Sequence, residues 1–161
     1  MWPIVADLYT PLLVLMVFWI AYQAGQLKPA VILLSVSLLL VFGFSALELK
    51  LGIWHSWGLD FSTHTAILLP FYQMLVLLVV LPTPEPDKQG MHSLILHLKA
   101  FMALMLALVA GVGYGALMMQ LGYHTFADIL TTVISTYPLV WISFRLMRGV
   151  SVSSQQTEEA V

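Results

Sequence analysis

The chain has 161 residues and a formal net charge of -2; 60% of its residues are hydrophobic and only 9% are charged. Because a soluble domain carries about a quarter charged residues, this composition excludes an ordinary soluble domain and predicts a membrane protein. The acidic balance gives no basic footprint for nucleic acid, so no nucleic-acid partner is expected. The sequence contains no cysteine, which excludes disulfides, a thiolate nucleophile and a cysteine-ligated metal.

Five long apolar segments organise the chain. A helix needs about 20 apolar residues to cross ~30 Å of hydrocarbon. Helices are expected because an open strand cannot satisfy its backbone in lipid. The sequence therefore predicts an all-α integral membrane bundle of five transmembrane helices, at residues 8–24, 29–49, 65–81, 98–119 and 129–146.

The connections between these segments differ in character. Residues 26–29 predict a tight turn, and residues 82–88 form a polar loop rich in proline. Residues 93–99 read as a short amphipathic lead-in to the fourth segment. The polar end of the chain, 149–161, is typical of disorder. The expected organisation is one transmembrane domain, 1–148, followed by a disordered cytoplasmic tail, 149–161.

The distribution of lysine and arginine predicts the orientation. Short cytoplasmic loops carry an excess of these residues. With the N-terminus outside and the C-terminus inside, Lys50 is the one cation on the outer face. The other five are cytoplasmic: Lys28, Lys88, Lys99, Arg145 and Arg148. We therefore expect a multi-pass protein of a bacterial inner (cytoplasmic) membrane in this orientation.

The outer face then has two loops, 48–64 and 122–128, which hold three of the five histidines. Trp54, Trp57 and Tyr123 suit the aromatic belt at a membrane interface. Outward histidines could suggest a metal, but no pair has the short helical spacing of a metal motif. No metal site and no cofactor are expected.

His64 follows Ser62 and Thr63 at the expected start of the third membrane helix. The start of a helix presents unpaired N–H groups and positive dipole to an anion, so Ser-Thr-His there could bind a phosphate and donate a proton. The alternative is a helix capped by Ser62 or Thr63, with a surface histidine beside it.

His124 and Asp128 lie four residues apart, so on one helical face they can meet. A carboxylate bonded to one imidazole nitrogen fixes the tautomer and makes the other nitrogen a better nucleophile or base. The alternative is a capping box, with Thr125 as the cap and Asp128 at the third helical position.

The two patterns together, Ser-x-His in one outer loop and His-x-x-x-Asp in the next, resemble the type-2 phosphatidic acid phosphatase superfamily. That family has three signatures: Lys-x6-Arg-Pro, Pro-Ser-Gly-His and Ser-Arg-x5-His-x3-Asp. The resemblance covers residues 50–134 and implies a phosphatidic-acid-phosphatase-like core. It differs from the family at several positions: Trp57-Gly58 replaces Arg-Pro, Phe61 replaces proline, Thr63 replaces glycine, and Leu117-Met118 replaces Ser-Arg.

The resemblance implies a role for each matching residue. His124 would be the nucleophile, Asp128 the carboxylate that orients it, and His64 the acid that protonates the leaving oxygen. Lys50, Ser62 and Thr63 would contact the substrate. Both arginines that hold the phosphate in the family are absent here, and a bidentate arginine supplies directional charge that a lysine does not.

Two functions remain open on the sequence. The first is a divergent membrane phosphatase or phosphotransferase, which acts without metal on a lipid-borne phosphate at the outer face. The second is a non-catalytic membrane protein of the same fold, serving as a lipid-binding or assembly subunit. Retention of His64, His124 and Asp128 favours chemistry, and loss of the arginines favours the second. A membrane lipid is the expected partner in both, and the first requires the two outer loops to meet.

Overall fold

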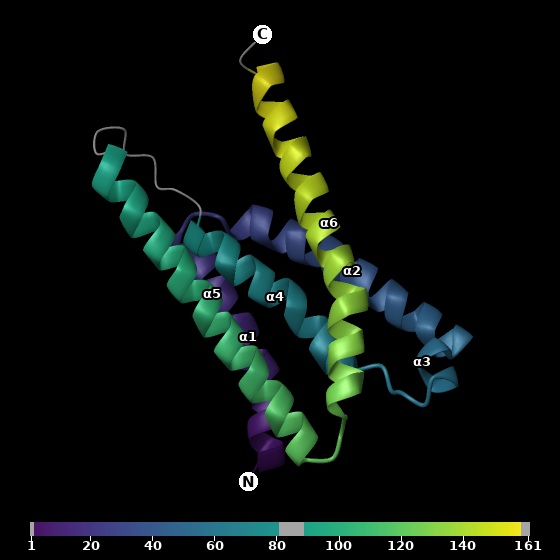
Figure 1. The fold of residues 1–161 in the computed structure, drawn as a ribbon. Helices are drawn as coiled ribbons and strands as arrows, with labels where there is room; N and C mark the ends of the chain where they lie inside the picture. Colours follow the sequence, from purple (N-terminus) through teal and green to yellow (C-terminus); the bar gives the residue numbers. More distant parts are fainter. Residues whose placement is uncertain (1, 81–88, 159–161) are drawn as a thin grey trace. The chain divides into compact units, whose positions relative to one another are not determined.

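A computed structural model of the chain describes residues 2–80 and 89–158, and these residues form helices and the turns between them (Figure 1). No strand occurs in these two ranges, so the all-α prediction is confirmed. The helices are α1 (Trp2–Gln23), α2 (Leu27–Leu51), α3 (Ile53–Ser56), α4 (Thr63–Val80), α5 (Gln89–Gln120) and α6 (Phe126–Glu158).

Four stretches of helix are long and apolar enough to cross a membrane: Trp2–Gln23, Leu27–Leu51, His97–Gln120 and Phe126–Leu146. This pattern is that of a multi-pass membrane protein. The helix α4 is apolar but has only 18 residues, which corresponds to about 27 Å at the usual helical rise. That length is slightly less than the ~30 Å hydrocarbon layer, so the fifth span stays a prediction.

Several boundaries differ from those expected. The first turn occupies residues 24–26, and Lys28 and Pro29 already lie in the first turn of α2, where a missing proline N–H costs no helical bond. Residues 93–99 are part of the continuous helix α5. The helix α6 is assigned as far as Glu158, and the disorder expected for residues 149–161 stays a prediction. The proline-rich loop 82–88 and Lys88 lie outside the described residues.

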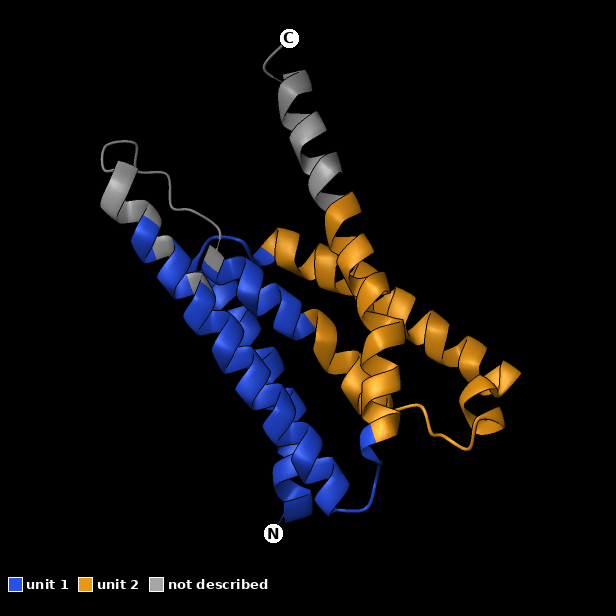
Figure 2. Cartoon of the chain, in the orientation of Figure 1, with its two compact units in different colours: residues 1–27, 71–126 blue, residues 28–70, 127–161 orange. Residues whose placement is uncertain are grey.

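The chain divides into two compact units (Figure 2). Unit 1 comprises Met1–Leu27 and Phe71–Phe126, and unit 2 comprises Lys28–Pro70 and Ala127–Val161. The boundary within α4 falls at Pro70, which is fully buried. Proline inside a helix removes one backbone hydrogen bond, so the division coincides with the weakest point of this helix's hydrogen-bond ladder.

Unit 1 is centred on tyrosines. The rings of Tyr9 and Tyr114 stack with centroids 4.6 Å apart, which fixes α1 against α5. The hydroxyl of Tyr9 also forms a hydrogen bond with that of Tyr72 on α4. Gly111 of α5 faces the Tyr72 ring, with 3.6 Å between that ring and an ideal Cβ position. A small residue thus lets a large ring approach the helix, as is common between membrane helices.

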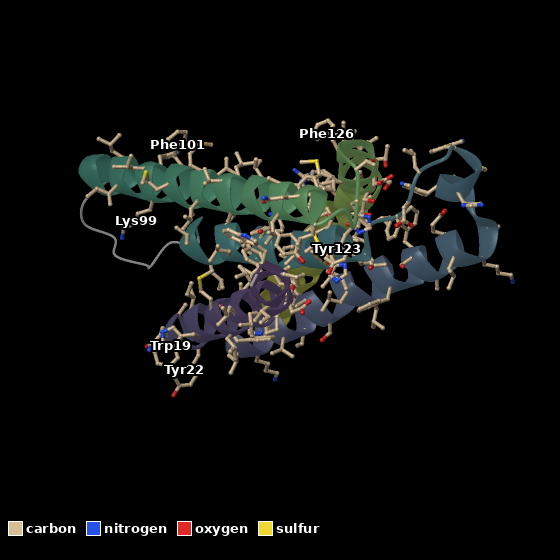
Figure 3. The ribbon with its side chains drawn as sticks, turned by 90° about the horizontal axis from the view of Figure 1, so that it is seen from below. Trp19, Tyr22, Lys99, Phe101, Tyr123 and Phe126 are labelled. Carbon is tan, nitrogen blue, oxygen red and sulfur yellow. The ribbon has the colours of Figure 1, made fainter. Side chains whose placement is uncertain are left out.

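The outer surface of unit 1 is apolar and carries aromatic residues at both ends. Figure 3 shows Trp19, Tyr22 and Lys99 toward one end of this unit, and Tyr123 and Phe126 toward the other. Trp19 and Phe126 are each 64% exposed. Large apolar side chains facing outward are unusual in a soluble protein, whereas aromatic residues at both ends of the helices match the two interfaces of a bilayer.

Candidate functional site

The junction of α2 and α3 is built around Glu48. Gly52 ends α2 with a φ of 61°, a left-handed conformation that redirects the chain into α3. The Glu48 carboxylate, only 8% exposed, accepts the N–H of Trp54 at 2.7 Å and the N–H of Ile53 at 3.1 Å. A buried carboxylate therefore satisfies the first N–H groups of α3, which have no partner within that helix.

Trp54 connects α3 to α6. Its indole N–H donates to the Thr131 hydroxyl at 3.0 Å, and its ring meets Phe61 and Phe44 edge-on at centroid distances of 5.2 and 5.9 Å. The side chain is 4% exposed. The interpretation of Trp54 as an interfacial belt residue is therefore wrong, because both its ring and its N–H are used inside the protein. Trp57 is 65% exposed and remains available to an interface.

Two further side chains of α6 bind the backbone before α4. Asp128 accepts the N–H of Asp60 at 2.8 Å, and the Thr132 hydroxyl accepts the N–H of Ser62 at 3.0 Å. Asp128, Thr131 and Thr132 are three and four residues apart, so they share one helical face; we name them the α6 clasp. The segment before α4 and the first turn of α6 thus meet at Asp60 and Asp128.

Ser62 caps α4, as one of the two interpretations predicted. Its hydroxyl accepts the N–H of Thr65 at 3.4 Å and pairs with the Thr65 hydroxyl at 2.9 Å. The Ser62 side chain is fully buried, so its expected contact with a substrate is replaced by a structural role. Thr63 and His64 are the first two residues of α4, and both are exposed.

His124 precedes α6 and does not belong to it. The helix α5 ends at Gln120, Gly122 in the following turn has a φ of 74°, and α6 begins at Phe126. His124 and Asp128 therefore do not share the one helical face that was expected, because His124 is not helical; a pairing of the two side chains stays a prediction. Asp128 does occupy the third position of α6 and is 5% exposed. His124 belongs to unit 1, and its approach to His64 in unit 2 stays a prediction.

Lys50, which was expected to contact the substrate, also has a structural explanation for its position. Lys50 is exposed in the last turn of α2, where a cation interacts favourably with the negative end of the helix dipole. Met118, which stands in place of a family arginine, is 3% exposed on α5. Met118 is thus an apolar residue in the interior of unit 1.

Residues absent from the sequence-based site include Glu48, Thr131 and Thr132. Glu48 offered a signal, because it is the one carboxylate in the second apolar segment and an ionisable residue there marks a functional or structural centre. Thr131 and Thr132 gave no signal in the sequence, since threonine is common on membrane helices. Among the described residues, no group of three His, Cys, Asp or Glu residues could hold a metal ion.

The site therefore combines an exposed helix start at Thr63 and His64 with the clasp that holds it to α6. The free N–H groups and positive dipole of such a helix start can attract an anion. No family model, curated protein or solved structure matches the chain, so the functional proposal rests on these residues and on the resemblance of their pattern.

Proposed function

We propose that the protein is a divergent membrane phosphatase or phosphotransferase acting on a lipid-borne phosphate at the outer face of the membrane. One observation supports this best: Asp60 and Ser62 donate their backbone N–H groups to Asp128 and Thr132. The segment that leads into His64 is thereby fixed to the start of α6, two residues after His124. The proposed mechanism requires these two segments to meet.

In this proposal the phosphate lies at the start of α4, near Thr63 and His64, with Lys50 supplying further positive charge. An imidazole nitrogen of His124 attacks the phosphorus, and the bond from phosphorus to the lipid oxygen breaks. His64 gives its proton to that leaving oxygen. Water then attacks the phosphohistidine and releases phosphate, which restores His124. Ser62 takes no part, because it is buried as the cap of α4.

The proposal is tested by phosphate release from phosphatidic acid in detergent micelles, in the presence of EDTA. His124→Ala should abolish release and the acid-labile phosphoenzyme. His64→Ala should slow the reaction by about 100-fold, a typical contribution of general acid catalysis. His97→Ala on α5 is the matched control and should retain activity. Full activity in His124→Ala would refute the proposed nucleophile.

A specific observation also favours the second function, that of a non-catalytic lipid-binding or assembly subunit. Asp128 and Ser62 are 5% and 0% exposed, and both accept backbone N–H groups. These contacts give both side chains a role in stabilising the fold, so neither requires a catalytic role. On this reading, no lipid phosphate is hydrolysed by the purified chain.

Asp128→Asn separates the two functions. The amide oxygen of asparagine can still accept the Asp60 N–H, so the variant should unfold within a few degrees of the wild-type temperature. If Asp128 orients a nucleophile, its activity should nevertheless fall, since the amide lacks the charge that stabilises the imidazolium. A wild-type chain that is folded but inactive on every lipid phosphate tested would support the subunit function.

A further inference from the structure

A cavity of about 480 Å³ lies beside α3, within unit 2. Its size is in the range of small-molecule sites. Its lining includes Ser45, Glu48, Trp54, His55, Asp60 and Phe61. These described lining residues include two carboxylates, and none of them is a lysine or arginine. The cavity is therefore suited to a positively charged occupant.

The two carboxylates differ in their surroundings. Glu48 is 8% exposed, and each of its oxygens accepts one backbone N–H from α3. A carboxylate oxygen has a second acceptor direction, so Glu48 can still receive a donor from the cavity. Asp60 is exposed, and its backbone is held by Asp128. A buried and an exposed carboxylate thus contribute to one fixed wall.

The rest of the lining favours an organic cation over a metal ion. Trp54 and Phe61 line the cavity and lie edge to face, 5.2 Å between centroids. Aromatic rings beside carboxylates suit an alkylated ammonium group, which binds through both charge and apolar contact. A metal ion would need several oxygen or nitrogen ligands around one point, and the described residues contain no such group.

The cavity also lies where a lipid headgroup would be. Glu48, Leu49 and Gly52 line it, and the candidate membrane span Leu27–Leu51 ends among them. The end of a membrane helix lies at the interface of hydrocarbon and water. We propose that this cavity binds an organic ammonium group, supplied by a lipid headgroup or by a water-soluble amine. The cavity shares Thr63 with the proposed phosphate site, but the ammonium proposal rests on the carboxylates and the aromatic rings of the lining and does not require a reaction at His124.

The test uses the full chain in non-ionic maltoside micelles, with Trp54 as its sole tryptophan after the other four are replaced by phenylalanine. Tetramethylammonium chloride should produce a saturable change in Trp54 emission, and sodium chloride at equal ionic strength should not. Asp60→Asn should weaken the affinity by about fivefold, the upper range for one exposed charge pair. Ser45→Lys, which adds a tethered ammonium to the lining, should abolish the response.

Asp7→Asn provides the matched control, because it removes an exposed acidic charge from α1 that is not part of this cavity's lining, and should leave the affinity unchanged. Circular dichroism should show the same helix content in each variant. A sole-Trp54 chain that responds to no ammonium compound would overturn the proposal. Equal affinities in the parent chain, Asp60→Asn and Ser45→Lys would overturn it too.

The source of the ammonium group is distinguished by a second titration. Short-chain phosphatidylethanolamine is compared with free ethanolamine, and short-chain phosphatidylglycerol is the lipid without an ammonium group. Tighter binding of the phosphatidylethanolamine identifies a lipid headgroup, whereas equal binding of the two ethanolamine compounds identifies a soluble amine. A response to phosphatidylglycerol equal to that of phosphatidylethanolamine would refute recognition of the ammonium group.

Discussion

Glu48 shows how one buried residue shapes the junction of α2 and α3 in unit 2. Its carboxylate follows the apolar part of α2, and it accepts the first N–H groups of α3. Burying a carboxylate is costly unless donors compensate it, and here two backbone donors do so. The short helix α3 and the cavity beside it therefore depend on a single side chain.

We expect Glu48→Ala to lower the free energy of unfolding by about 2 kcal/mol, because it leaves two N–H groups of α3 without their acceptor. Unfolding of the purified chain in mixed micelles, followed by circular dichroism, measures the change. Leu49→Ala is the control: Leu49 is 88% exposed, and its truncation should change stability by less than about 0.5 kcal/mol. Equal effects of the two substitutions would contradict the capping role.

The contribution of the Ser62 cap to the stability of the fold can also be measured. Ser62→Ala removes the oxygen that accepts the Thr65 N–H, and should cost about 1 kcal/mol. Ser62→Gly should cost less, since glycine is tolerated at a helix cap. The same unfolding experiment compares the free energies of unfolding of the wild type, Ser62→Ala and Ser62→Gly. An alanine variant as stable as the wild type would show that the cap contributes nothing.

The helix α6 is the element that organises unit 2. Three side chains of the clasp bind α3 and the segment before α4, and the Ser62 N–H that Thr132 accepts is a buried group that needs a partner. The same helix carries Thr136, which is fully buried and whose hydroxyl has no hydrogen-bond partner. The helix therefore carries two buried threonines that differ in hydrogen bonding: the Thr132 hydroxyl accepts a backbone N–H, whereas the Thr136 hydroxyl has no partner.

These two threonines make a matched pair. Thr132→Val leaves the buried Ser62 N–H without its acceptor, and should cost about 1–3 kcal/mol. Thr136→Val replaces an unpaired hydroxyl by a methyl group of similar size, and should be neutral or slightly stabilising. Both variants are compared with the wild type by unfolding in mixed micelles. A larger loss in Thr136→Val than in Thr132→Val would contradict the proposed clasp.

At the scale of the whole molecule, the pattern of exposed apolar surface fits a multi-pass membrane protein. Arg145 lies over the Trp141 ring at 4.5 Å, near the end of the candidate span Phe126–Leu146. A cation stacked on an aromatic ring suits a membrane interface. Lys28 lies at the start of α2 and Arg145 near the end of the α6 span, and their location on the cytoplasmic face stays a prediction.

Cysteine labelling tests this topology directly, since the chain has no cysteine of its own. Trp57→Cys and Tyr123→Cys should react with an impermeant maleimide in intact cells, and Lys28→Cys only after permeabilisation. A cysteine at Pro84 should behave like Lys28→Cys if α4 crosses the membrane. Labelling of both Trp57→Cys and Pro84→Cys from outside would show that α4 does not cross.

The sequence by itself determined the membrane class and the helical architecture, and it offered Ser62 or Thr63 as the cap of α4. These are local properties: composition sets the preferred solvent, and Ser62 acts on a group three residues away. The sequence did not determine the number of membrane spans, because α4 is short for a bilayer. The sequence also predicted that the outer loops meet, but only through the resemblance, and it did not predict which atoms join them.

Only the tertiary structure shows which partners Trp54 and Asp128 contact. Asp60 and Asp128 are 68 positions apart, and Trp54 and Thr131 are 77 apart. No periodicity relates residues so distant, so the pattern could not reveal that Trp54 is buried or that Asp128 binds a backbone N–H. Whether a polar side chain serves a substrate or the fold depends on which partner the packing brings to it, and here α6 brings the backbone before α4.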